Sequence, residues 1–137
     1  MTATTINAIS TSGAGYTALV GRILLAAIFI LSGFSKIADP AMTIGYIGSV
    51  GLPLPQLGLG IAVLVEIVGG IALILGYRTR LVAITMAIFS LATAAVFHSA
   101  LGDQNQFIHF FKNVAMAGGL LQVAAFGAGP AGLDSRR

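Results

Sequence analysis

The feature that most constrains this chain is the apolar run at residues 57–77, LGLGIAVLVEIVGGIALILGY, which has one carboxylate, Glu66, in its middle. About 20 apolar residues are enough for a helix to cross a lipid bilayer. A carboxylate at the centre of such a helix is costly unless it faces protein or water. Gly69 and Gly70 follow on the same helical face and leave room for a neighbouring helix. The run therefore predicts a membrane helix bundle with a polar interior.

The composition places the whole chain in the integral membrane class. Of its 137 residues, 57% are hydrophobic and 8% are charged, and the mean hydropathy is +0.98. A soluble domain needs a charged shell, and about a quarter of its residues are charged. The net charge of +3 comes from Lys and Arg residues near predicted helix ends, where they act as anchors at the membrane surface. This distribution excludes nucleic acid as a partner and indicates the lipid bilayer.

The absence of cysteine restricts the chemistry that this chain can perform. Its own side chains can form no disulfide, exchange no thiol and ligate no iron–sulfur cluster. Any redox role would need a bound cofactor or a partner protein. The sequence also has no phosphate-binding glycine loop, nucleophile elbow or paired histidines on a helix, so no motif assigns a catalytic residue.

Hydropathy and turn residues predict an all-α domain at residues 16–128 with four membrane spans. We expect a flexible N-terminal tail at 1–15, an exposed C-terminal tail at 129–137, and spans at about 17–38, 57–76, 81–101 and 110–127. Short connections favour an antiparallel up-down-up-down four-helix bundle.

A short surface helix is expected between the first two spans. Asp39 followed by Pro40 is typical of a helix start, and Gly51, Pro53 and Pro55 end whatever helix forms. We expect this helix to lie over the mouth of the bundle.

One stripe of the first span is predicted to face the other helices. Spacings of three and four residues bring five residues onto this stripe, namely Arg22, Ala26, Phe29, Gly33 and Lys36. Ala27 lies off the stripe and is expected to face outward.

The polar residues of the spans are predicted to converge at one end of the bundle. Helical side chains lean toward the N-terminus of their own helix, so Lys36 leans inward from the outer rim while Glu66 leans outward. His98 ends the third span, and Lys112 and Asn113 begin the fourth at the same level. We therefore expect these five side chains to line one polar cavity beneath the surface helix.

Structural roles for the same residues stay open. Glu66 either handles protons or a ligand, or it fixes the helix register through a buried hydrogen bond or ion pair. Lys36 either turns inward or anchors the helix at the interface, and His98 is either a proton carrier or an interfacial residue. Arg22 is expected to extend to the cytoplasmic surface, although the sequence leaves open whether Glu66 pairs with Lys36 or with Arg22.

No metal site is expected from the two histidines. His98, His109 and Asp103 would have to be brought together by an unstructured loop. They have no helical spacing that would organise them as ligands in advance.

Several short segments, taken together, resemble the DoxX family of small bacterial four-helix membrane proteins. They are GRILLAAIFILSGFSKIADP, the GLP turn, VLVEIVGGIALILGYRTR, the His98 end of the third span, and FFKNVAMAGG. The resemblance covers about residues 17–127, and its characteristic positions are Arg22, Gly33, Lys36, Glu66, Gly69, His98, Lys112 and Asn113.

The resemblance implies a redox-associated role, because the family is named for relatives associated with a thiosulfate:quinone oxidoreductase. In one hypothesis the cavity holds a quinone head group, with Lys36, Glu66 and His98 handling its protons. The electrons would then pass through a membrane or soluble partner protein. In the other hypothesis the chain is a non-catalytic scaffolding subunit, alone or as a homo-oligomer, whose buried polar residues only specify helix packing.

Lys and Arg are distributed unequally between the two ends of the predicted bundle. Five lie at the end with both termini and two at the opposite end, namely Arg22, Arg78, Arg80, Arg136 and Arg137 against Lys36 and Lys112. By the positive-inside rule both termini are expected in the cytoplasm, with the protein in the bacterial inner membrane.

This asymmetry makes a testable prediction about topology. Alkaline phosphatase fused after Arg137 should be inactive and green fluorescent protein at the same position should fluoresce, because both report a cytoplasmic C-terminus. An active phosphatase fusion would show that the bundle has the opposite orientation.

Overall fold

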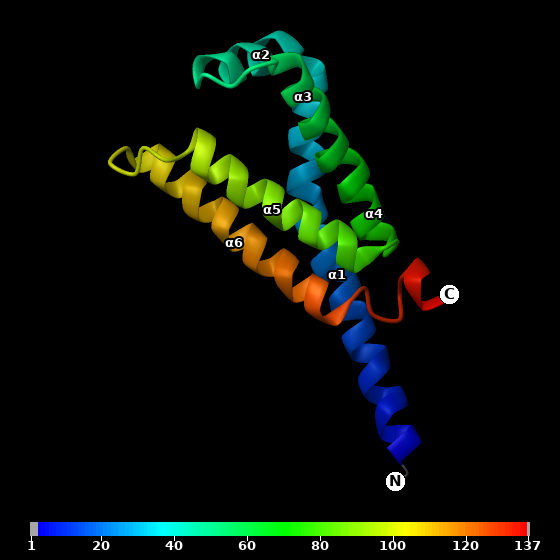
Figure 1. The fold of residues 1–137 in the computed structure, drawn as a ribbon. Helices are drawn as coiled ribbons and strands as arrows, with labels where there is room; N and C mark the ends of the chain where they lie inside the picture. The colour runs from blue at the N-terminus through cyan, green and yellow to red at the C-terminus, as the bar shows by residue number, and fades with distance from the viewer. Residues whose placement is uncertain (1–2, 137) are drawn as a thin grey trace.

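The computed structural model describes the backbone of residues 3–136, with side chains from Gly13 onward, and shows an all-helical chain (Figure 1). The elements are α1 (Ala3–Ala38), α2 (Pro40–Ser49), α3 (Pro55–Val63), η1 (Leu64–Val68), α4 (Gly69–Leu75), α5 (Thr79–Phe97), α6 (Gln104–Phe126) and η2 (Leu133–Arg136). The segments α3, η1 and α4 follow one another without a break and form one helix. The all-α prediction is confirmed over the described residues.

Three helical segments in the described part of the chain are long and apolar enough to cross a membrane. They are Gly13–Ala38, Pro55–Leu75 and Thr79–Phe97. Their bounds lie within about four residues of the first three predicted spans. The 23-residue α6 corresponds to the fourth predicted span, but it is not among the three.

The structure corrects the start of the fourth helix. Residues before 110 were predicted to form a loop, whereas α6 begins at Gln104. Asp103 is the cause, because its side chain accepts a hydrogen bond from the backbone N–H of Gln106 at 3.0 Å. An acidic N-cap followed three residues later by Gln is the pattern of a capping box. His109 therefore lies on a helix and not in a loop.

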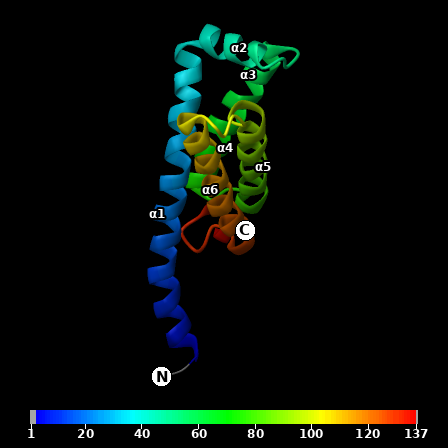
Figure 2. The same ribbon diagram turned by 90° about the vertical axis from the view of Figure 1, so that its left-hand side faces the viewer.

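The structure also differs from the expected N-terminal tail, because α1 already begins at Ala3. With 36 residues, α1 is about 54 Å long at 1.5 Å per residue. Its N-terminal part extends beyond the other helices in both views (Figures 1 and 2). No proline or charged residue in the first 15 positions interrupts the helix. It ends where Pro40 disfavours a helical conformation at Asp39, whose φ is −138° and ψ 77°.

Two helix pairs build the fold. One consists of α1 and the continuous α3–η1–α4 helix, and the other of α5 and α6, which are inclined to α1 in Figure 1. The helix expected between the first two spans is α2, where the Asp39 side chain accepts a hydrogen bond from the backbone N–H of Met42 at 3.1 Å.

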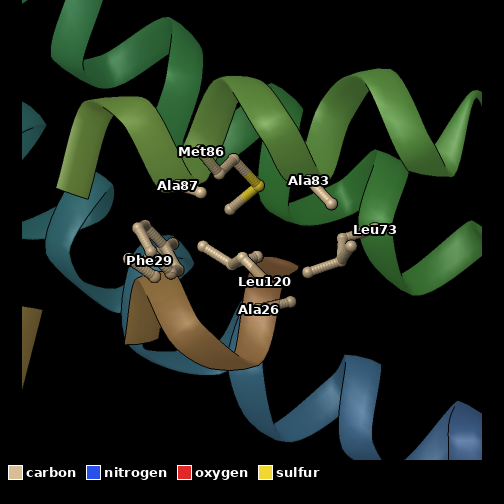
Figure 3. Packing of buried hydrophobic residues seen from close by; sticks show 8 residues of the cluster. Ala26, Phe29, Leu73, Ala83, Met86, Ala87 and Leu120 are labelled. Carbon is tan, nitrogen blue, oxygen red and sulfur yellow. The ribbon is translucent and has the colours of Figure 1, made fainter. Parts of the chain in front are cut away.

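Small side chains fill much of the core between the two pairs (Figure 3). The cluster consists of Ala26, Phe29, Leu73, Ala83, Met86, Ala87, Ala117 and Leu120. Four of these eight residues are alanine, so the helices can approach closely, as is common in membrane bundles. The core lies between the two ends of the bundle, and the polar groups gather at those ends.

The predicted stripe of α1 is confirmed as its packing face. Ala26 is fully buried, Gly33 is buried as well, and Ala27 is exposed. A side chain at Gly33 would collide with Ile67, because an added Cβ would lie 2.5 Å from its Cγ1 atom. The same close approach occurs at Gly70, where an added Cβ would lie 2.6 Å from Ile30 Cγ1. These glycines allow the α3–η1–α4 helix to lie directly against α1.

The C-terminal segment, predicted to be an exposed tail at 129–137, is exposed or partly exposed over the described residues 129–136, and it contacts the α4–α5 turn. Ala128 is buried, and the carboxylate of Asp134 accepts hydrogen bonds from the backbone N–H groups of Arg78 and Thr79, both at 2.8 Å. The first N–H groups of a helix lack partners within the helix, so Asp134 acts as the cap of α5. The segment thus holds the turn between α4 and α5 in place.

The packing face makes a matched pair of substitutions informative. Ala26→Leu should lower the free energy of unfolding by about 1 to 3 kcal/mol, because it overfills a closed interface. Ala27→Leu adds the same atoms on the exposed face and should change the stability little. Thermal melts followed by circular dichroism in detergent would measure both variants. Equal losses at the two positions would contradict the assigned face.

Candidate functional site

A cavity of about 530 Å³ lies where α1, α2, the α3–η1 segment, α5 and α6 meet. Five residues singled out in the sequence contribute to its lining, namely Lys36, Glu66, His98, Lys112 and Asn113. Most of the other lining side chains are apolar, among them Phe29, Ile61 and Phe89. The structure therefore brings the expected polar residues together inside a largely apolar wall.

The most buried charge in this wall is Glu66, which is 5% exposed. Its partner is Lys36, whose Nζ atom lies 3.0 Å from each of the two carboxylate oxygens. Ser32, one turn before Lys36, accepts a hydrogen bond from Nζ at 2.8 Å and donates one to Glu66 Oε1 at 3.3 Å. The question of which cation pairs with Glu66 is settled in favour of Lys36.

The backbone around Glu66 is a π-helix rather than an α-helix. The segment η1, Leu64–Val68, has Glu66 at its centre, and the N–H of Gly69 donates to the carbonyl of Leu64, five residues earlier. Single π turns inside α-helices are rare and occur often at functional sites. The widened turn lies where α1 passes close to it, since a Cβ added at Gly33 would lie 3.3 Å from Glu66 Cβ. No pattern in the sequence predicted this turn.

A second polar cluster joins the ends of α5 and α6. His98 Nδ1 lies 3.2 Å from Gln106 Oε1, and the rings of His98 and His109 stack with centroids 5.1 Å apart. Lys112 Nζ lies 3.0 Å from His109 Nδ1.

His98 follows the apolar helix Thr79–Phe97. Burial lowers the pKa of His98, and the nearby His109 and Lys112 lower it further. The hydrogen bond with Gln106 raises this pKa, but by less than burial lowers it. The neutral imidazole is therefore favoured at pH 7.

Hydroxyl and amide groups complete the polar part of the cavity wall. Asn113 Nδ2 donates a hydrogen bond to Thr93 Oγ1 at 3.1 Å, and Thr93 Oγ1 donates to the carbonyl of Ser90 at 3.0 Å. Tyr46 connects α2 to the end of α5, because its hydroxyl donates to the carbonyl of Phe97 at 3.1 Å and the two rings are in contact. Sequence reasoning missed Thr93 and Tyr46, since neither is charged nor part of an obvious helical stripe.

Arg22 is the one candidate that the structure places elsewhere, about 21 Å from Lys36 along α1. It was expected to extend to the membrane surface, but it is 1% exposed. Its guanidinium donates to the carbonyls of Leu73 at 2.8 Å, Ile74 at 2.7 Å and Ala131 at 2.6 Å. The last carbonyls of a helix have no partner within it, and a cation at this end is favourable. Arg22 thus caps α4 and does not line the cavity.

The residues described contain no group of three or more His, Cys, Asp or Glu side chains that could hold a metal ion. His98 and His109 are in contact, but Asp103 serves as the cap of α6 and does not join them.

Comparisons with known proteins agree with the resemblance found in the sequence. The DoxX family model matches residues 17–99, a range that includes Lys36, Glu66 and His98. The chain is 37% identical over 123 residues to the inner membrane protein YphA of Escherichia coli K12, covering 86% of this chain and 88% of that protein. It is also 37% identical over 116 residues to the inner membrane protein YqjF of the same organism, covering 85% and 88%. No solved structure matches the chain.

The ion pair predicts a specific pattern of stability. Lys36→Met should lower the free energy of unfolding by about 2 to 4 kcal/mol, because it leaves a buried carboxylate without a partner. The double variant Lys36→Met, Glu66→Gln removes both charges and should regain more than half of that loss. Denaturant titration in detergent would measure the three proteins. A single variant as stable as the parent, or a double variant no better than the single, would contradict the pairing.

Proposed function

The chain belongs to the DoxX family, and we propose that it is a four-pass inner membrane protein that binds a quinone head group in the cavity beside Lys36 and Glu66. In this proposal α6 is the fourth span of an antiparallel bundle, both termini are cytoplasmic, and the cavity opens toward the outer side. The chain acts as a redox-associated subunit.

One observation carries the proposal: an ion pair with 3.0 Å separation lines a cavity of about 530 Å³ among apolar helices. Ligand pockets of roughly 300 to 1,000 Å³ with mostly apolar walls and a few polar groups are typical of small-molecule sites. Ionisable residues inside membrane bundles are costly, so they favour a functional role. A quinone fits this chemistry, because its ring is apolar and its two carbonyl oxygens accept hydrogen bonds.

The side chains can divide the work of binding and proton exchange. The ammonium group of Lys36 and the hydroxyl of Ser32 can donate hydrogen bonds to a carbonyl oxygen of the quinone. Glu66 can accept a proton when a bound hydroquinone is oxidised, a change that releases two protons and two electrons. His98, His109 and Lys112 can pass protons between the cavity and water. Because the chain has no cysteine, the electrons must go to a bound cofactor or to a partner protein.

The second candidate function is a scaffolding subunit without a ligand. It is favoured by the connection that Ser32, Lys36 and Glu66 make between α1 and η1. Such a network can specify the register of two helices with no further role. In this case any partner protein would bind the outer surface of the bundle and the cavity would hold only lipid or water.

Co-purification tests the two candidates. Protein extracted in mild detergent from quinone-containing membranes should carry quinone, which mass spectrometry detects. The double variant Lys36→Met, Glu66→Gln should retain the fold but carry about tenfold less, because it loses the charge-assisted hydrogen bond from Lys36, worth about 1.4 kcal/mol.

The control for this experiment is Asp103→Asn, which makes the same acid-to-amide change at the cap of α6, outside the cavity lining. It should carry as much quinone as the parent protein. If the parent carries none and binds none after addition of a short-chain quinone, the scaffolding function is the better one.

A further inference from the structure

A second hollow lies at the opposite end of the bundle from the cavity. It has a volume of about 480 Å³ and is lined by the start of α5, the end of α6 and the C-terminal segment. Arg78, Arg80 and Phe126 contribute side chains to it. We propose that this hollow binds the phosphate of an anionic phospholipid headgroup.

The first argument is the charge of the hollow. Arg80 is exposed, and its side chain makes no hydrogen bond or ion pair with any other residue that the structure describes. Its guanidinium lies against Gly127, where an added Cβ would be 3.4 Å from Nε and 3.6 Å from Nη2. The guanidinium of Arg78 lies 5.9 Å from the ring centre of Tyr77. Two guanidinium groups at one hollow match a phosphate, which accepts paired N–H donors in one plane.

Among the lining residues that the structure describes, Asp134 carries the only carboxylate, so two arginines against one carboxylate leave the lining with a net positive charge. Asp134 directs both oxygens to the backbone N–H groups of Arg78 and Thr79, at 2.8 Å each. It thereby caps the start of α5. Arg78 Nε donates a hydrogen bond to the Tyr77 hydroxyl at 3.4 Å, so the two Nη groups of Arg78 and the guanidinium of Arg80 remain to donate to a phosphate.

The second argument is the position of the hollow relative to the membrane. The apolar helix begins at Thr79, so Arg78 and Arg80 lie at the boundary between hydrocarbon and water, where lipid phosphates lie. Large apolar side chains are exposed beside them, with Phe126 78% and Leu81 61% exposed. These side chains can contact the acyl chains of a lipid whose phosphate is held by the arginines. A free phosphate ion would gain nothing from them, so the occupant is a phospholipid.

The proposal can be tested in purified protein. Phosphatidylglycerol added to the detergent-solubilised chain should raise its melting temperature by several degrees, whereas phosphatidylcholine with the same acyl chains should not. Native mass spectrometry should show one bound phosphatidylglycerol. In Arg80→Gln the apparent affinity should fall about fivefold, the effect of removing one arginine at the membrane surface.

Arg136→Gln is the matched control, because Arg136 is an exposed arginine that follows the lining residue Ser135 but does not itself line the hollow. It should retain the affinity of the parent protein. Equal stabilisation by phosphatidylcholine, an equal loss in Arg136→Gln, or the same rise with inorganic phosphate alone would overturn the proposal. The quinone content is measured separately and at the other end of the bundle, so failure of one proposal leaves the other intact.

Discussion

An ion pair inside an apolar bundle is the interaction on which the rest of this structure depends. A carboxylate among apolar helices must have a partner, and Lys36 on α1 supplies it to Glu66 at 3.0 Å. To make this contact, α1 must pass η1 closely, which requires the absence of a side chain at Gly33. The buried stripe of α1 therefore lets the two helices approach closely enough for the Lys36–Glu66 ion pair to form.

The two ends of the bundle use their polar groups differently. At the end with the α4–α5 turn, Arg22 caps the carbonyls of α4 and Asp134 caps the N–H groups of α5. The charged side chains at this end therefore supply hydrogen-bond partners to backbone atoms that the helices leave unpaired. At the other end the polar side chains bond to one another around a cavity. At one end, buried side chains thus serve the helix termini, whereas at the other end they line the cavity and include groups that can exchange protons.

Much of the candidate site could be predicted from the sequence, because helical periodicity and side-chain direction are local properties. The spacing of Lys36 on α1 and the position of Glu66 in an apolar run were enough to place both in one cavity. The same reasoning was wrong for Arg22, since depth along a helix does not reveal whether protein or lipid covers a side chain. The start of α6 was also wrong, although Asp103 and Gln106 carry a capping pattern that could have found it.

The sequence by itself determined the membrane class, the approximate bounds of three membrane-length helices, the packing face of α1 and the set of polar residues that meet at one end. These follow from hydropathy and from the 3.6-residue period, which need no knowledge of neighbouring helices. Only the tertiary structure decided the π turn at Glu66, the capping of α4 by Arg22 and the docking of the C-terminal segment through Asp134. The two caps join residues that lie far apart in the sequence, and residue type alone does not say which backbone atoms will be left without a partner. The π turn is local, but no sequence pattern marks it.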